Sequence, residues 1–447
     1  MATLLIQNAR IVNEGQIIEA DIFVKNGLID QIGRNLSFPA DTYIDAAGKY
    51  VLPGVIDDQV HFREPGLTHK ATIYTESKAA VAGGTTTFME MPNTVPNALT
   101  QELLADKYEI GKQSSLANYS FFMGASNDNY DEAMRTNLKE VCGLKIFMGS
   151  STGNMLVDNE VILGRLFGNF EGLIATHCED EATVRKNLAV FKERFKDTPA
   201  HELPADIHAL IRDEKNCYIS SEMASNLAKK NNTRLHILHI STKEELALFR
   251  NDIPLAEKRI TAEVCIHHLW FDAADYDQLG NQIKCNPAIK HGHRDALLQG
   301  LLDDKLDILA TDHAPHTWQE KQQDYWSAPA GLPLVQHSLL ALLDFVKQGK
   351  LTLEKVVEKA AHAPAICFQI DRRGFIREGY WADLVIVDLD ASTQVTKESL
   401  HAKCGWSPFE NHTFPARIEQ TIVSGHVVYN QGKFDESVKG QRLAFNR

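Results

Sequence analysis

The sequence predicts an α/β protein, a (β/α)₈ barrel of the TIM type with a small β-sandwich domain built from both termini. Three observations lead to this fold class. The first fifty residues are rich in β-type runs, apolar β-rich runs then alternate with helical patterns, and β-rich sequence returns near Asp371. Alternating strands and helices indicate βα units around a parallel sheet. A length of 447 residues suits one such barrel with a smaller unit attached.

The elements follow in order along the chain. Short strands with near-alternating apolar positions are expected in the first fifty residues. Eight strands are then expected at YVLPGVIDD (50–58), TTTFMEMPN (85–93), YSFFMGA (119–125), GLKIFMG (143–149), LIATHCE (173–179), LHILHIS (235–241), TAEVCIHH (261–268) and DILATDH (307–313). Helical stretches separate them, and two more, at 332–349 and 352–368, follow the eighth strand. Eight strand–helix repeats favour a closed barrel.

The domain boundaries follow from these changes of pattern. Residues 1–51 and 371–447 are expected to form the two parts of the β-sandwich, and residues 52–370 the barrel. The stretches GFIREGYWADLVIVDLD and IEQTIVSGHVVYNQGKF supply the C-terminal strands.

Composition excludes several classes of partner. A hydrophobic content of 44% with 23% charged residues is ordinary for a globular protein. The net charge of −13 argues against a nucleic acid or an anionic membrane as partner. No signal peptide and no membrane-spanning stretch are expected. The seven cysteines are scattered and never spaced as CxxC, which is typical of free thiols in a reducing cytoplasm.

Ionisable residues recur at the carboxyl ends of the expected strands, where a barrel carries its catalytic groups. A single histidine there is more often a hydrogen-bonded core residue, but six residues at the same end indicate a site. Imidazole and carboxylate groups suit Zn²⁺ or a similar divalent metal. The six residues are Asp57 and His61 on strand one, Lys145 on strand four, His177 on strand five, His239 on strand six and Asp312 on strand eight.

Four motifs carry a family resemblance, which runs nearly from end to end. HFREPG (61–66), MPN (91–93), GLKIFMG (143–149) and TDHAPH (311–316) together resemble the dihydroorotase branch of the amidohydrolase superfamily. The resemblance implies a metal-dependent cyclic amidohydrolase with a barrel and a terminal β-sandwich. It also implies the substrate: reversible hydrolysis of L-dihydroorotate to N-carbamoyl-L-aspartate, a step of pyrimidine synthesis.

The resemblance also implies the metal ligands. His61 and Asp312 would hold a first metal ion and His177 and His239 a second. Lys145 would bridge them as a carbamate formed with CO₂, because an unmodified ammonium facing a metal is disfavoured by desolvation and like-charge repulsion. Asp312 would in addition move the proton during catalysis. One or two Zn²⁺ ions per chain are expected.

One departure from the family pattern lies within the first motif. The family has Asp-x-His-x-His on strand one, and this chain has Gln59 in place of the first histidine. A glutamine oxygen is a poorer Zn²⁺ ligand than an imidazole. Three outcomes stay open: Gln59 or water completes the first site, the site holds one metal, or the chain is a non-catalytic relative.

The substrate side is predicted from the same resemblance. Arg63, Asn93 and His316 would hold the ring carboxylate, and Asn286 in KCNPAIK would contact the ring. An arginine suits this role because its planar fork matches a carboxylate. The polar stretch 317–331 is expected to be a loop that could cover the site.

Two alternative functions remain open at this stage. The first is a related dihydropyrimidinase, hydantoinase or allantoinase, whose substrates lack the ring carboxylate that Arg63 would bind. The second is a non-catalytic partner subunit of aspartate transcarbamoylase, for which Gln59 is the chief argument. A small-molecule substrate, a possible homodimer and a cytoplasmic location complete the expectations.

Overall fold

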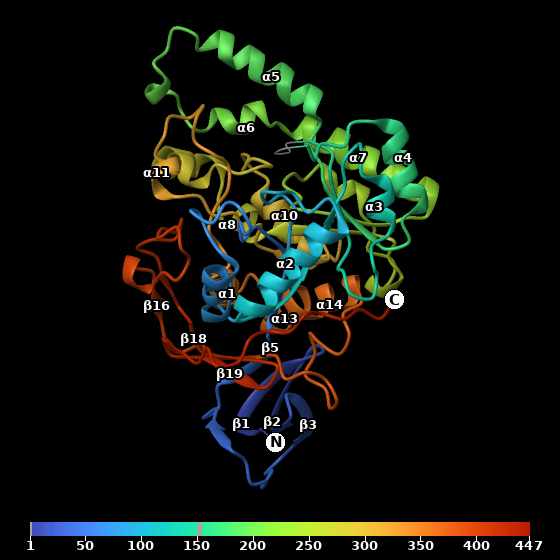
Figure 1. Cartoon of the computed structure of the whole chain (residues 1–447). Coiled ribbons are helices and arrows are strands. Elements are labelled where there is room, and N and C mark those ends of the chain that lie inside the picture. Colours follow the sequence, from blue (N-terminus) through green and yellow to red (C-terminus); the bar gives the residue numbers. More distant parts are fainter. Residues whose placement is uncertain (1, 150–153) are drawn as a thin grey trace.

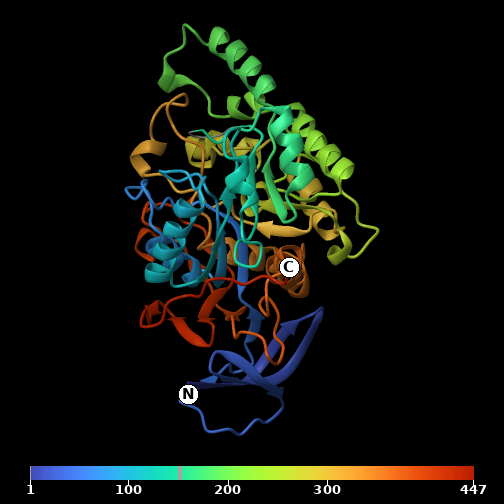
Figure 2. The same cartoon turned by 45° about the vertical axis from the view of Figure 1, so that its right-hand side comes forward.

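Strands from both ends of the sequence form one nine-stranded sheet. The computed structural model describes residues 2–149 and 154–447. The strand order is β20-β19-β18-β15-β5-β1-β2-β3, and β4 pairs with β1. In Figures 1 and 2 the blue N-terminal strands and the red C-terminal strands lie together at the bottom of the molecule. The strands are β1 (Thr3–Asn13), β2 (Gln16–Lys25), β3 (Leu28–Gly33), β4 (Thr42–Asp45), β5 (Tyr50–Pro53), β15 (Leu384–Asp388), β18 (Arg417–Val423), β19 (His426–Asn430) and β20 (Lys433–Phe434). A separate pair joins β16 (Thr393–Gln394) to β17 (Thr413–Phe414).

The middle of the chain carries parallel strands in two runs, β6-β7-β8 and β9-β10-β11-β12-β13-β14. A parallel bridge between Val60 and His313 connects the end of the second run to the start of the first. Each of the eight predicted strands overlaps at least one of these elements, and the third, 119–125, is divided between β8 and β9. Their bounds are β6 (Val55–Val60), β7 (Thr85–Glu90), β8 (Asn118–Phe121), β9 (Met123–Gly124), β10 (Leu144–Phe147), β11 (Leu173–His177), β12 (Arg234–Ile237), β13 (Ile260–Cys265) and β14 (Ile308–Ala310).

The first predicted strand, 50–58, is in fact two strands, and the sequence prediction was wrong on this point. β5 belongs to the nine-stranded sheet, whereas β6 begins the parallel run. The break falls at Gly54, where an added Cβ would lie 2.2 Å from the Thr86 side chain. Only glycine allows this close approach between the two segments.

Helices connect the strands and cover the parallel sheet. They are α1 (Ile73–Ala82), α2 (Gln101–Ser114), α3 (Tyr130–Met134), α4 (Glu160–Asn169), α5 (Glu181–Arg194), α6 (Ile207–Ile211), α7 (Glu214–Asn231), α8 (Ile266–Trp270), α9 (Tyr276–Leu279), α10 (Arg294–Leu302), α11 (Trp318–Lys321), α12 (Ser338–Lys347), α13 (Leu353–Val357) and α14 (Ala363–Phe368). Within residues 2–149 and 154–447, none is long and apolar enough to cross a membrane.

Two helices differ from the sequence prediction. The stretch 332–349 becomes helical only at Ser338; before it, Leu332 forms a parallel bridge with His313, and the backbone N–H groups of Leu334 and Val335 donate to Nδ1 of His313. The stretch 352–368 contains a π-helical turn, Glu358–His362, immediately before α14. Pro364 in the first turn of α14 lacks an N–H group and cannot continue a regular hydrogen-bond ladder.

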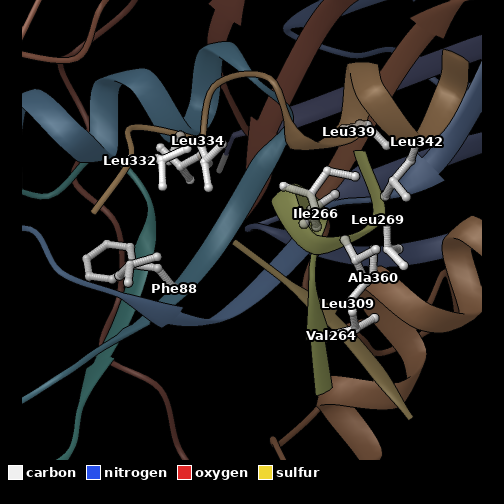
Figure 3. Close-up of a cluster of buried hydrophobic side chains, with 14 of the residues drawn as sticks. Phe88, Val264, Ile266, Leu269, Leu309, Leu332, Leu334, Leu339, Leu342 and Ala360 are labelled. Atoms are coloured by element: carbon white, nitrogen blue, oxygen red, sulfur yellow. The ribbon is translucent and has the colours of Figure 1, made fainter. Parts of the chain in front are cut away.

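The main core lies between the parallel strands and the helices. Val264 and Leu309 project from neighbouring strands toward Ala360, and Leu269 lies close to Leu342 (Figure 3). These side chains are nearly inaccessible to solvent. Burial of such apolar surface contributes roughly 25 cal/mol for each square ångström removed from water. The core therefore fixes the strands whose ends carry the site.

A buried ion pair supports the end of strand β6. Lys107 Nζ on α2 lies 2.8 Å from Glu90 Oε2, and both side chains are 1% exposed. Glu90 Oε1 accepts the backbone N–H of Phe62, which lies between two predicted site residues. The pair thus fixes the backbone that leads from His61 to Arg63.

Replacing Lys107 with Met should destabilise the protein by about 3 kcal/mol or more, because Glu90 would be left as an uncompensated buried charge. The matched control is K112M on the same helix, since Lys112 pairs with Glu109 and is 72% exposed; its effect should stay within about 0.5 kcal/mol. Chemical denaturation measures both. Equal effects of the two substitutions would contradict this role of the buried pair.

Candidate metal centre and substrate cavity

One cavity of about 320 Å³ collects all the residues predicted for the site except Asp57. It opens at the carboxyl ends of the parallel strands, where β6, β7, β10, β11, β12 and β14 end. The predicted residues that line it are Gln59, His61, Arg63, Asn93, Lys145, His177, His239, Asn286, Asp312 and His316, and Phe147, Ala314, Pro329, Ala330 and Gly331 complete the wall.

His61 and Asp312 face each other across the first half of the cavity. His61 Nδ1 lies 2.8 Å from Asn93 Oδ1, and because an amide oxygen only accepts, Nδ1 carries the proton. His61 Nε2 therefore presents a lone pair to Asp312 Oδ1, 3.1 Å away. Two lone pairs in this arrangement fit a divalent cation between them.

His177 and His239 form a second pair of candidate ligands. His177 Nε2 lies 2.9 Å from Glu179 Oε2, so the carboxylate accepts its proton. His177 Nδ1 is left as an acceptor, 2.9 Å from His239 Nε2. Burial lowers the pKa of both histidines and holds them neutral, the form that binds metals. This donor set also fits a divalent cation.

Glu179 was missed by the sequence prediction although it follows His177 by two residues. Its carboxylate is fully buried and is also paired with Arg212. Burial opposes ionisation, but Arg212 and His177 hold the pKa of Glu179 below its ordinary value. The carboxylate therefore fixes the tautomer of His177. The sequence signal that could have identified Glu179 was its place two residues after a histidine at the end of a strand.

Lys145 lies on β10 with 1% of its surface exposed. Among the described residues no carboxylate forms an ion pair with its amine. Burial lowers the pKa of Lys145 to about 7, against the opposing effect of Asp312 and Glu263. A substantial share of the amine is then unprotonated at neutral pH, which is the form that reacts with CO₂. The environment of Lys145 is suited to carbamate formation.

Gln59 acts as a hydrogen-bond donor in this structure. Its Nε2 lies 3.3 Å from Asp312 Oδ1, and its Oε1 lies 3.8 Å from the thiol of Cys265. The amide group turned toward the first metal position therefore carries protons and not a lone pair. In this arrangement His61 and Asp312 offer the lone pairs on that side.

On the substrate side of the cavity, hydrogen-bond donors outnumber the acceptors that face them. Arg63 Nη2 lies 3.1 Å from His316 Nε2, and Lys70 Nζ lies 3.0 Å from His316 Nδ1. His316 Nε2 also lies 2.9 Å from the Ala330 carbonyl oxygen, which only accepts, so Nε2 carries the proton and Nδ1 accepts from Lys70. Burial, Arg63 and Lys70 lower the pKa of His316 well below its ordinary value and keep the ring neutral, so Arg63 Nη2 faces an N–H group. An anion near Arg63 and Asn93 would satisfy the remaining donors.

The segment 317–331 was expected to be a loop; it begins with the short helix α11, and its last three residues line the cavity. Lys321 Nζ donates to the carbonyl oxygens of Lys284, Pro329 and Gly331 at 2.9–3.1 Å. Lys284 Nζ in turn donates to the carbonyl oxygens of Tyr325 and Ala328 at 2.6 Å. The two buried lysine side chains therefore hold this segment against the cavity, which its polar composition alone did not reveal.

Asp57 was expected among the site residues but does not line the cavity. Its Oδ2 accepts the Thr311 hydroxyl at 2.6 Å, and its Oδ1 lies 3.2 Å from the Thr311 backbone N. Asp57 thus joins β6 to the segment after β14. His236 also lies outside the cavity, 3.2 Å from both Asp58 and Glu263 in a buried cluster.

Backbone strain is concentrated at the same site. Arg63, His239 and Asp312 adopt φ values of 70°, 40° and 49° in the left-handed region, where residues with a Cβ are seldom found. Such conformations persist where the surrounding structure imposes them, often at functional sites. They turn these side chains into the cavity.

Comparison with known proteins agrees with this geometry. The profile of the Amidohydrolase family matches residues 50–428. The chain belongs to the amidohydrolase family. Three curated relatives of this amidohydrolase are named dihydroorotase, and each is 32% identical to it. They come from Methanosarcina acetivorans (96% of this chain, 92% of the relative), Halobacterium salinarum (92% and 93%) and Bacillus pumilus (96% and 99%).

Two solved structures of the same fold are hydantoinases. The L-hydantoinase of Arthrobacter aurescens superposes with a TM-score of 0.91 at 26% identity, covering 99% of this chain and 100% of its own. The D-hydantoinase of a Thermus species gives 0.85 at 24% identity, covering 98% and 97%. This amidohydrolase therefore shares its fold with enzymes of known structure over nearly its whole length.

Substituting Glu179 by Gln should weaken zinc binding at the His177–His239 position by about ten- to a hundredfold, because loss of an outer carboxylate lowers the affinity of the histidine it orients. Zinc titration with a competing chelator measures this. The matched control is E193Q on α5, where the side chain is 75% exposed. Unchanged zinc affinity in E179Q would contradict the role of Glu179.

Substituting Gln59 by His should tighten zinc binding at the His61–Asp312 position by at least about tenfold, because an imidazole lone pair replaces an amide donor. Zinc content after dialysis against increasing chelator measures the change. If wild type and Q59H lose both metal ions at the same chelator concentration, Gln59 does not weaken the first position.

Proposed function

We propose that this amidohydrolase is a dihydroorotase, which interconverts L-dihydroorotate and N-carbamoyl-L-aspartate in pyrimidine synthesis. One observation carries the proposal: Arg63, Asn93 and His316 line the same cavity as the metal-ligand candidates. Dihydroorotate carries a cyclic amide and a carboxylate. The amide matches the metal side of the cavity, and the carboxylate matches the side that holds Arg63, Asn93 and His316. The names of the curated relatives support the same assignment.

The metal ligands are part of the proposal. His61 and Asp312 would hold one Zn²⁺ ion, His177 and His239 another, and Lys145 as its carbamate would contact both. A weaker first position follows from Gln59, which donates to Asp312. When bound, zinc supplies Lewis acidity and brings the pKa of a water molecule near 7.

The side chains divide the remaining work. Arg63, Asn93 and His316 bind the ring carboxylate and orient the amide bond. Oδ1 of Asp312 accepts from Gln59 and faces the lone pair of His61, so we assign Oδ2 to take the proton from the attacking water and return it to the departing ring nitrogen. The loop 317–331 limits the access of bulk water. In the synthetic direction the same groups act in reverse order.

The architecture is proposed in full on the same basis. Residues 52–370 would close into a (β/α)₈ barrel, and residues 1–51 with 371–447 would form a β-sandwich beside it. The bridge between Val60 and His313 and the pairing of β5 with β15 support these assignments. The seven cysteines lie in the described part of the chain and are free there, which supports a reducing cytoplasm.

The deciding experiment is turnover of L-dihydroorotate by the purified protein supplied with zinc and bicarbonate. Turnover is expected to depend on both additions, because zinc fills the metal positions and bicarbonate supplies the CO₂ for Lys145. A folded, zinc-loaded protein without turnover would overturn the proposal in favour of a non-catalytic partner subunit.

A hydantoinase is the second candidate, because the L-hydantoinase of Arthrobacter aurescens superposes with a TM-score of 0.91. Hydantoins and dihydropyrimidines lack the ring carboxylate, so Arg63 separates the two functions. Substituting Arg63 by Met should lower kcat/KM for dihydroorotate by about a hundredfold, since a buried charge-assisted bond to the substrate is lost. Dihydrouracil is the control substrate. Nearly intact turnover of dihydroorotate by R63M would exclude a carboxylate role for Arg63.

A further inference from the structure

His208 lies where helix α6, the segment 317–331 and the segment that carries Asn286 meet. It belongs to α6 and is 3% exposed. His208 Nδ1 lies 2.9 Å from Tyr325 Oη. His208 Nε2 lies 2.8 Å from the Cys285 carbonyl oxygen and 3.0 Å from Asn286 Oδ1. Both ring nitrogens are therefore engaged.

These partners determine the tautomer of His208. A backbone carbonyl and an amide oxygen can only accept, so Nε2 carries the proton. Nδ1 must then accept from the Tyr325 hydroxyl. Burial, together with the nearby cations of Arg212 and Lys284, keeps the pKa of His208 well below its ordinary value and the ring neutral.

The tautomer in turn orients the amide of Asn286. Because Oδ1 is held by His208, the Nδ2 edge is left for the cavity that Asn286 lines. An asparagine in this orientation offers protons to a ligand. A cyclic amide presents ring carbonyl oxygens, which are acceptors, so the two match.

We propose that His208 is a positioning residue that makes Asn286 a hydrogen-bond donor to a ring carbonyl oxygen of the substrate, and that Tyr325 maintains this state from the loop. The inference rests on the proposed function, because the substrate is taken to be a cyclic amide. A flipped Asn286 amide would set an oxygen against the substrate oxygen and would lose the bond.

Packing and a hydrogen bond hold Tyr325, one partner of His208, in place. Tyr325 shares a small apolar cluster with Ile207 and Ile211, which flank His208 on α6, and with Val184 of α5. The Tyr325 carbonyl oxygen also accepts from Lys284 Nζ at 2.6 Å. α5 and α6 extend from the body of the molecule at the end opposite the N-terminal strands (Figure 1). α5 and α6 are thus connected to the substrate cavity by the contact of His208 with Asn286.

Two substitutions separate positioning from packing. The side-chain nitrogen of glutamine can occupy the place of Nε2, whereas asparagine is shorter and reaches only the place of Nδ1. H208Q therefore keeps a donor to Asn286, and H208N removes it while the site stays polar. We expect H208N to raise KM for dihydroorotate about tenfold with little change in kcat, which is the effect of losing one hydrogen bond to the substrate. H208Q should stay within about threefold of wild type.

Three further variants complete the test. H201N is the matched control, because the His201 side chain is 80% exposed between α5 and α6; its KM should be unchanged. Y325F should raise KM in the same direction as H208N, and it provides the measurement if H208N does not fold. In an N286A background, H208N should have no additional effect, because its consequence passes through Asn286.

The outcomes separate this inference from the proposed function. Active wild type with equal KM values for H208N and H208Q would overturn the inference and leave the function standing. The same holds if H208N keeps its full effect in N286A. Wild type that neither turns over nor binds dihydroorotate would overturn both.

Discussion

The site depends on one constraint. Buried hydrogen-bond acceptors lie together on one side of the cavity, and buried donors lie together on the other. On one side the lone pairs of His61 and Asp312 face each other, and beside them the ring nitrogens of His177 and His239 lie 2.9 Å apart. On the other side Arg63 and Lys70 lie against a single neutral imidazole, which accepts from Lys70 and turns an N–H group toward Arg63. Unmatched buried groups of this kind cost about 1–3 kcal/mol each. A cation on the first side and an anion on the second remove that cost, which is why the cavity suits a metal ion together with a carboxylate.

The rest of the molecule maintains this unfavourable arrangement. The core holds the strands, and the ion pair of Lys107 with Glu90 fixes the backbone after β6. Left-handed backbone conformations turn Arg63, His239 and Asp312 inward. Buried lysines hold the segment 317–331 against the cavity. The stability of the surrounding structure thus offsets the cost of these buried polar groups, which lack partners until a metal ion and a substrate bind.

The sequence was most informative where a general rule connects position along the chain to position in space. Carboxyl ends of parallel strands meet at one edge, so His61, Lys145, His177, His239 and Asp312 could be grouped from their places after apolar runs. The same rule misassigned Asp57, because it cannot tell which strand-end side chain turns toward a neighbouring strand. Arg212, His208 and Lys321 could not be predicted, because their partners lie in other segments of the chain and their roles depend on tertiary contacts. The break at Gly54 likewise depends on contact with Thr86.

The most direct test is a crystal structure of the zinc-loaded protein with dihydroorotate bound. Zinc is expected between His61 and Asp312 and between His177 and His239, with a carbamate on Lys145. The ring carboxylate is expected against Arg63, Asn93 and His316. Ring density with the carboxylate turned toward the metal ions, or zinc bound away from these histidines, would contradict the division of the cavity into a cation side and an anion side.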